Sequence, residues 1–234
     1  MTAKSSAPSL AAALETSAWL HNPATGELAH FAPTEADGRR IEVDLWLQPG
    51  ASVARPHIHD HFVERFSILE GEVGFQVAGS ERVAHSSDGA VEVPAGTAHD
   101  WWNAGDGVAH VRVEVEATET APGRPAARFV SMIEAMWSMG ALGRVNTKGV
   151  PNALWLAAIT REYRDAIRLA KPPAPVQAAI FGPLAAIARR TGHNPLAPEL
   201  HGPDGACAIP DPDVDGLAKL LNKRVGARAA RGRG

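Results

Sequence analysis

Cysteine is almost absent from this chain of 234 residues, which contains only Cys207. A single cysteine excludes an intramolecular disulfide, so the fold must be stabilised by its core, as is usual in a reducing cytoplasm. The chain also lacks a strong charge of either sign: 23 Lys and Arg residues balance 26 Asp and Glu residues, and the net charge is −3. Such a balance gives no reason to expect a nucleic-acid partner.

Long hydrophobic runs are missing as well. The apolar segment 174–188 is shorter than the ~20 residues needed to cross a membrane, and Gly182-Pro183 interrupts it. We interpret it as a buried helix. Residues 1–21 contain a short apolar run interrupted by Glu15 and show no clear cleavage pattern, so we predict a partly ordered leader and not a signal peptide. The expectation is a cytoplasmic protein without a membrane partner.

Short alternating segments separated by turn residues are abundant between residues 27 and 116. Hydrophobic residues make up 45% of the chain and charged residues 21%, as in globular proteins. Period-two patterns that predict strands occur at 41–47, 62–69, 72–78, 90–94 and 110–117. Many short strands without intervening helices favour an antiparallel sandwich or barrel. We place this barrel at residues 22–118.

The pattern changes after a Pro- and Gly-containing linker at 119–127. Apolar residues then recur at helical spacing, which predicts helices at 128–142, 152–170 and 176–190, the last kinked at Pro183. We expect residues 128–192 to form an α-helical extension that caps the barrel mouth or provides a dimer surface. Residues 193–234 are predicted to be an irregular, basic C-terminal tail.

The segment HIHDHFVERFSILEG, residues 57–71, places three histidines and two glutamates among strand-forming residues. His57 and His59 are two positions apart, so on a strand both project from one face. Glu64 has the wrong parity for that face. The chain must therefore bend near Asp60-His61 if the three side chains are to meet.

A second segment, VPAGTAHDWWN at 93–103, contributes another histidine. Pro94 and Gly96 fit positions i+1 and i+3 of a tight turn. His99 would then enter a strand with Trp101 on its own side and Trp102 on the other.

These two segments resemble the motifs of the cupin superfamily. The first cupin motif matches Gly50, His57, His59, Glu64 and Gly71, and the second matches Pro94, Gly96, His99 and Asn103. The spacing departs from the family pattern by one extra residue before His57 and by Asp88-Gly89 where Gly-Asp is usual. Both departures lie in turns and leave the ligand spacing intact. More weakly, the chain resembles quercetin-dioxygenase-like bacterial cupins with a helical C-terminal extension.

This resemblance implies a mainly β fold, the cupin double-stranded β-helix or jelly-roll barrel. It also implies one metal ion bound by His57, His59, Glu64 and His99. Three imidazoles and one carboxylate suit a divalent transition metal, which can be Fe, Mn, Ni, Cu or Zn.

His61 does not fit the ligand spacing. It is either a solvent-facing loop residue or a catalytic acid/base beside the open coordination positions. Phe62, Phe66 and Trp101 either fill the barrel core or line a pocket for a small-molecule substrate. In the strand at 110–117 we expect the valines to point inward, with Arg112 on the solvent side.

The resemblance leaves the reaction open. The metal ion would keep two positions for substrate, water or O₂, and we favour a dioxygenase acting on a small aromatic or enolisable substrate. The alternatives are an isomerase, lyase or cyclase that uses the metal as a Lewis acid, and a non-catalytic small-molecule-binding protein. Cupins are frequently dimers, so a homodimer is expected.

Overall fold

A computed structural model describes residues 17–33, 37–52, 56–146 and 149–222. The barrel comprises β1 (Ala18–Asn22), β2 (Glu27–Phe31), β3 (Arg40–Leu47), β4 (His57–Ile58), β5 (Phe62–Glu70), β6 (Val73–Val77), β7 (Ser80–Ala84), the 3₁₀ turn η1 (Ser86–Asp88), β8 (Val91–Val93), β9 (His99–Asn103) and β10 (Ala109–Ala117). The C-terminal part comprises α2 (Pro125–Ala141), α3 (Ala153–Glu162), β11 (Arg168–Leu169), α4 (Ala174–Arg190), η2 (Pro198–Leu200), β12 (Ala208–Ile209) and α5 (Val214–Asn222).

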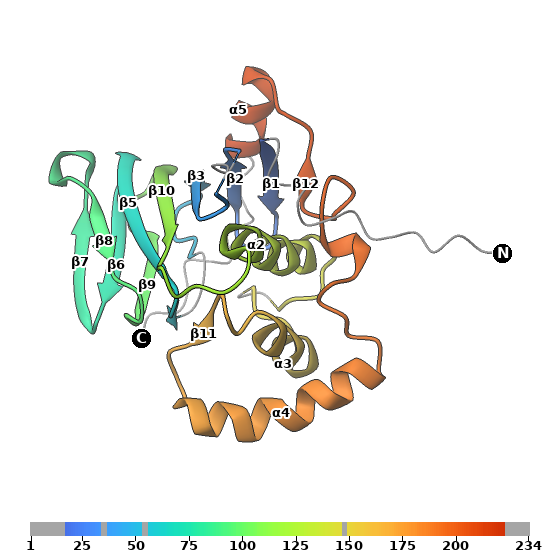
Figure 1. The fold of residues 1–234 in the computed structure, drawn as a ribbon. Helices are drawn as coiled ribbons and strands as arrows, with labels where there is room; N and C mark the ends of the chain where they lie inside the picture. Colours follow the sequence, from blue (N-terminus) through green and yellow to red (C-terminus); the bar gives the residue numbers. More distant parts are fainter. Residues whose placement is uncertain (1–16, 34–36, 53–55, 147–148, 223–234) are drawn as a thin grey trace.

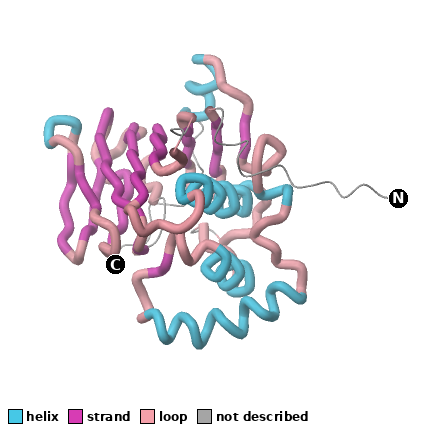
Figure 2. The backbone as a smooth tube through the Cα atoms, in the orientation of Figure 1, coloured by secondary structure: helices cyan, strands magenta, loops and turns pink. Residues whose placement is uncertain are grey.

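The strands form two antiparallel sheets with the orders β12-β1-β2-β3-β10-β5-β8 and β11-β4-β9-β6-β7. This arrangement confirms the predicted mainly β barrel with helices after it (Figures 1 and 2). Burial alternates along the long strands β3, β5 and β10, because successive side chains point to opposite faces. Val111, Val113 and Val115 point inward and Arg112 points outward, as expected.

The helices are not a separate unit. α2 contacts β1 and β10 of the barrel and also α3, and α3 contacts α4 (Figure 1). The apolar side chains of α2 belong to the same core cluster as the inward residues of the strands. The helical extension therefore covers one side of the barrel and shares its core.

Several elements differ from the sequence expectation. The helix predicted at 152–170 ends at Glu162, because residues 168–169 pair with β4 as strand β11. The helix predicted from residue 128 begins at Pro125, where a proline fits the first helical turn. The third helix extends from Ala174 to Arg190 and contains Pro183, but the prediction that it is buried is wrong: only Ala185 and Ala188 are buried, and Val176, Ile180 and Ile187 are exposed.

Both ends of the described chain also form strands or helices where the sequence predicted little regular structure. β1 begins at Ala18, inside the predicted leader, and pairs with β2. β12 lies within the segment predicted to be irregular and pairs with β1, and α5 follows it. The leader before residue 17 and the basic residues after 222 lie outside the described part of the chain. No helix in the described ranges combines the length and the apolar character that crossing a membrane requires.

Candidate metal centre

The bend at Asp60-His61 separates two strands, as the side-chain parity requires. β4 ends at Ile58 and β5 begins at Phe62, so the alternation starts again after the bend. Glu64 thereby shares the buried face of β5 with Phe62 and Phe66. His57, His59 and Glu64 are all buried, with exposed fractions of 3–5%.

The second segment brings His99 to the same place. The backbone N–H of Thr97 donates to the Pro94 carbonyl (3.2 Å), and Gly96 has φ +78°. Pro94 and Gly96 therefore occupy positions i and i+2 of the turn, one position earlier than predicted, because position i+2 is the one that needs a positive φ. The N–H of Gly96 also donates to the His59 carbonyl (2.8 Å), which fixes the turn beside the first segment.

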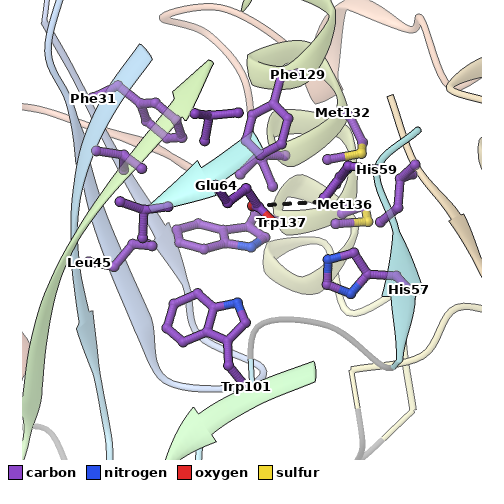
Figure 3. Close-up of a pocket in the computed structure, with 15 residues that line it drawn as sticks. Phe31, Leu45, His57, His59, Glu64, Trp101, Phe129, Met132, Met136 and Trp137 are labelled. Atoms are coloured by element: carbon purple, nitrogen blue, oxygen red, sulfur yellow. Dashed lines mark ion pairs between the residues drawn. The ribbon is translucent and has the colours of Figure 1, made fainter. Parts of the chain in front are cut away.

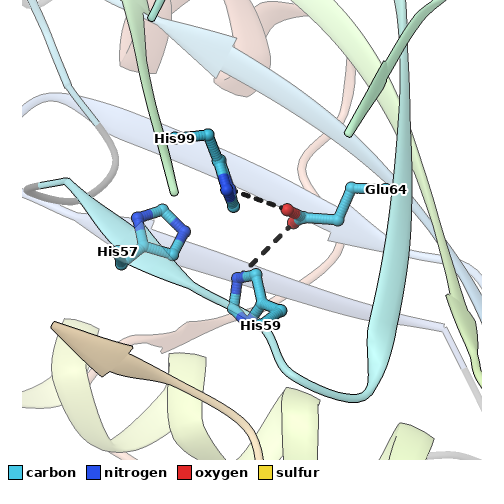
Figure 4. A group of neighbouring side chains, drawn as sticks. All are labelled: His57, His59, Glu64 and His99. Carbon is cyan, nitrogen blue, oxygen red and sulfur yellow. Dashed lines mark ion pairs between the residues drawn. The ribbon is translucent and has the colours of Figure 1, made fainter. Parts of the chain in front are cut away.

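The four polar side chains converge inside the barrel (Figure 4). One donor atom from each of His57, His59, Glu64 and His99 lies within 4.8 Å of the others. His99 Nε2 is 2.8 Å from Glu64 Oε2, and His59 Nε2 is 3.7 Å from Glu64 Oε1. His57 and His99 are also partners in the pairing of β4 with β9. Residues from two distant segments thus surround one centre.

The hydrogen bonds of the imidazoles leave Nε2 directed at this centre. His59 Nδ1 donates to the carbonyl of Ala166, and His99 Nδ1 donates to the carbonyl of Thr97 (3.0 Å). A backbone acceptor at Nδ1 fixes the tautomer in which Nε2 carries the lone pair, which is the usual arrangement of metal-binding histidines.

Two buried atoms at the centre have no hydrogen-bond partner among the described residues. Glu64 Oε2 and His99 Nε2 are 2.8 Å apart, but with the His99 hydrogen on Nδ1 both atoms are acceptors and do not satisfy each other. A buried polar atom without a partner is costly, and a cation bound between the two would satisfy both. The donor set therefore fits a metal ion.

The electrostatics of the cluster agree with that fit. Burial raises the pKa of Glu64, but attraction to His59 and the close contact with His99 outweigh it and hold this pKa at about 2. Burial lowers the pKa of His59 despite the nearby Glu64 carboxylate. Near neutral pH an ionised carboxylate and the neutral His59 imidazole are therefore available as ligands. Three nitrogen donors and one oxygen donor suit Fe, Mn, Ni, Cu or Zn.

A cavity of about 40 Å³ adjoins the cluster (Figure 3). Apart from His57, His59 and Glu64, every side chain that lines it is aliphatic, aromatic or Met. The barrel contributes Phe31, Val43, Leu45, Trp101, Val113 and Val115. The helical extension contributes Phe129, Met132, Ile133, Met136, Trp137 and Ile167.

Comparison with known proteins identifies the barrel. The family model described as "Cupin domain" matches residues 45–116, which include all four cluster residues. Residues 45–116 therefore match a cupin domain. The search of the curated proteins found no significant match.

Solved cupin structures resemble the barrel only distantly. The cupin domain of Schizosaccharomyces pombe Cnp3 is 20% identical, with 38% of this chain and 65% of that chain covered and a TM-score of 0.34. The cupin domain of an XRE family transcriptional regulator from Enterobacter cloacae is 18% identical, with 40% and 99% covered and a TM-score of 0.36.

A predicted oxalate decarboxylase from Thermotoga maritima is 21% identical, with 46% of this chain and 96% of that chain covered and a TM-score of 0.37. This chain spans less than two thirds of the Cnp3 domain chain, namely 65% of its length. Likeness at these identities concerns the fold alone.

The aromatic residues of the cupin domain divide between cavity and core. Trp101 lines the cavity, whereas Phe62 and Phe66 are not among the described residues that line it. Phe62 packs edge-on against Phe129 with ring centroids 5.4 Å apart, and Phe66 packs against Trp101 at 5.0 Å. The two phenylalanines therefore lie in the core and pack against residues that line the cavity.

His61 lies in the bend between β4 and β5 and is half-buried. It is neither in the four-residue cluster nor among the described residues that line the cavity. No contact to the centre supports the catalytic role considered for His61, which stays a prediction.

Sequence reasoning missed the part of the site that comes from outside the cupin domain. Half of the apolar cavity wall belongs to α2 and to Ile167, and the acceptor for His59 is the carbonyl of Ala166. The spacing of residues 129, 132, 133, 136 and 137 predicts a buried helix face. It does not indicate that this face closes the barrel beside the histidines.

Proposed function

We propose that this protein is a metal-dependent cupin enzyme, a dioxygenase acting on a small aromatic or enolisable substrate. One observation carries the proposal: four metal-type donors are buried together, and three of them line a cavity whose other lining side chains are all aliphatic, aromatic or Met. His57, His59, Glu64 and His99 would hold the metal ion. When bound, a redox-active metal supplies adjacent sites for a substrate oxygen and for O₂.

The apolar wall supports oxygen chemistry over isomerase, lyase or cyclase chemistry. Moving a proton between substrate atoms requires a titratable side chain within hydrogen-bond reach. Among the described residues that line the cavity, only His57, His59 and Glu64 titrate, and these would be occupied by the metal. The wall instead excludes water and binds an apolar substrate.

The charge of the site restricts the substrate. A divalent cation and the Glu64 carboxylate leave one net positive charge, and no Arg or Lys is among the described residues that line the cavity. One anionic oxygen, such as a phenolate or an enolate, would balance this charge. A doubly charged phosphate or dicarboxylate would be left partly unpaired in an apolar pocket.

Size restricts the substrate further. The cavity volume of about 40 Å³ is far below the ~300–1,000 Å³ typical of pockets for drug-sized ligands. Size therefore favours the smaller candidates, catechols and 1,3-diketones, over flavonols.

Trp137 on α2 provides a second point of recognition. Its side chain is 2% exposed and lines the cavity, and its Nε1–H has no hydrogen-bond partner among the described residues. An indole N–H is a donor only, and buried donors are normally paired. A second substrate oxygen would satisfy it.

The test is metal analysis combined with an oxygen electrode. Protein purified without added metal is analysed for its metal content, and O₂ uptake is measured with catechols, 1,3-diketones and flavonols. We expect uptake with a small substrate and its loss in His99→Ala. His110→Ala, which alters a histidine that contacts Asp44 on the outer face, should retain activity.

The alternatives give different results in the same test. Turnover without O₂ uptake would contradict the dioxygenase and indicate an isomerase, lyase or cyclase that uses the metal as a Lewis acid. Binding without turnover would indicate a non-catalytic binding protein. The predicted homodimer is a separate proposal, to be tested by light scattering on the intact chain.

A further inference from the structure

We infer that the segment 166–170 of the helical extension positions the two histidines of the first motif, and that docking of this segment and metal binding strengthen each other. We call residues 166–170 the docking segment. They lie outside the region 45–116 that matches the cupin domain. The inference rests on the metal centre proposed above and adds to it a part of this chain beyond the cupin motifs.

The docking segment pairs with the strand that carries the first ligand. β4 contains only His57 and Ile58, and its pairing with β9 involves His57 alone. On its other side Leu169 pairs with His57 and Arg168 pairs with Ile58. The N–H of Ala170 also donates to the Pro56 carbonyl (3.0 Å). So short a strand needs this second neighbour to fix its position.

The same segment holds the second ligand directly. The carbonyl of Ala166 accepts the Nδ1 hydrogen bond of His59 in the buried interior. Ile167, the next residue, lines the cavity. One short segment thereby sets the tautomer and ring orientation of His59 and completes the pocket wall. Groups that orient metal-binding imidazoles in this way typically change metal affinity by about 10–100-fold when removed.

An ion pair attaches the segment to the bend. Arg168 Nε and Nη2 donate to the two carboxylate oxygens of Asp60, at 2.7 and 2.9 Å. Asp60 is the neighbour of His59 in the chain. The Arg168 and Asp60 side chains are 36% and 41% exposed, so removing this pair should change global stability little. Its position beside the ligand makes it a positioning contact that can be tested without unfolding the protein.

The segment is also connected to the pocket wall. Arg128 on α2 donates to both carboxylate oxygens of Asp165, at 3.0 and 3.1 Å. Asp165 immediately precedes the docking segment. A displacement of the segment would therefore reach both the metal ligands and the helix that lines the cavity.

The first experiment measures metal affinity with Arg168→Ala. Co(II) and Zn(II) are titrated into metal-depleted protein in competition with a chromophoric chelator. We expect the dissociation constant to rise about tenfold or more, and the Co(II) absorption bands to shift as the ligand geometry relaxes. Arg168→Lys should restore part of the affinity because it keeps the charge.

Arg40→Ala is the matched control. Arg40 forms a similar ion pair with Glu114, its side chain is 42% exposed, and it lies on β3 away from the first motif. We expect its metal affinity and Co(II) spectrum to equal those of the wild type. Equal unfolding midpoints of the metal-depleted variants would show that the affinity change is not a loss of fold.

The second experiment tests the coupling in the reverse direction, since linkage between two events is reciprocal. Metal binding should slow tryptic cleavage after Arg164 and Arg168 in the wild type, and slow it less at the remaining site, Arg164, in Arg168→Ala. Wild-type protein that binds no metal would overturn the metal centre itself. Metal binding with equal affinity and an unchanged spectrum in Arg168→Ala would overturn only the positioning role.

Discussion

Two buried glutamates of the barrel have opposite acidities. Glu64 lies among three histidines, and its pKa is held at about 2 although burial alone would raise it. Glu27 is 1% exposed, and its donors among the described residues are neutral: Asn22 Nδ2 at 2.9 Å and Thr25 Oγ1 at 2.6 Å. Burial therefore raises the pKa of Glu27 to about 7, despite these two hydrogen bonds. The same type of side chain is therefore an ionised candidate ligand at position 64 and a destabilising buried acid at position 27.

Glu27→Gln should remove a pH-dependent loss of stability. The pKa of Glu27 rises from 4.5 to about 7 on folding, so the folded protein binds the proton more tightly. Stability falls as the pH rises from about 4.5 to 7, and above pH 7 the full cost is about 3 kcal/mol. Urea unfolding at pH 5 and pH 8 should show little effect of the substitution at pH 5 and stabilisation at pH 8. An unchanged pH profile would refute this account, and exposed Glu81→Gln is the control.

Trp137→Phe tests whether the unpartnered indole N–H binds substrate. The substitution keeps a large aromatic ring but removes the donor. For a substrate found in the O₂ screen we expect KM to rise about three- to tenfold, the value of one hydrogen bond, with metal content unchanged. Trp155→Phe, a buried tryptophan outside the described cavity lining, should leave KM unchanged.

At the scale of elements, α2 is the connection between the cupin domain and the rest of the chain. Most of its 17 residues are buried, and its C-terminal end meets β1 at Gly140. A Cβ atom on Gly140 would lie 2.4 Å from Asn22 Oδ1. Asn22 cannot easily move, because its amide donates to Glu27.

Gly140→Ala should therefore destabilise the protein by about 1–3 kcal/mol, as other overpacked sites do. Gly182 in α4 is the matched control, since no atom lies within 4 Å of the corresponding Cβ position. Ala at Gly182 should change stability by less than about 1 kcal/mol, because its better helix propensity is offset by the following Pro183. Thermal unfolding of both variants measures the difference, and equal effects would contradict the close packing of α2 on β1.

The elements show which features could be predicted from sequence. The period-two pattern of β3, β5 and β10 predicts their inward faces, since one face is buried in each. The helical pattern of 152–170 misleads after Glu162, because pairing with β4 overrides local periodicity. The two-residue strands β4, β11 and β12 are too short to carry a period.

The candidate site also contains features that the sequence predicts and features that it does not. Motif spacing identifies His57, His59, Glu64 and His99 because each is fixed by its own local turn or strand. The cavity wall depends on how α2 packs against the barrel, and Ala166 contributes a backbone atom that no side-chain pattern reveals. Residues distant in sequence build those features together, so a linear pattern cannot predict them.

At the scale of the whole molecule, the last described part of the chain closes the fold. β12 pairs with β1 at the edge of the larger sheet. Leu200 and Cys207 are buried in the common core, and Gly202 N–H donates to Glu134 Oε1 on α2 (3.1 Å). The C-terminal segment thus packs on the outer side of the helix whose opposite side lines the cavity.

Two truncations distinguish the stabilising role of the segment that contains η2 and β12 from the role of α5 and the residues after it. A chain ending at residue 192 loses β12 and the buried Leu200 and Cys207, whereas a chain ending at residue 212 keeps them. Burying one such side chain contributes about 1.5–3 kcal/mol. We therefore expect the shorter chain to lose about 3–5 kcal/mol in urea unfolding and to bind metal more weakly, because α2 is no longer held against the barrel. The longer chain should match the intact protein in both measurements. If the chain ending at 192 were as stable as the intact one, the cupin domain with α2, α3 and α4 would be sufficient for the fold, and the contacts of α2 with the barrel and α3 would be enough to hold the cavity wall in place.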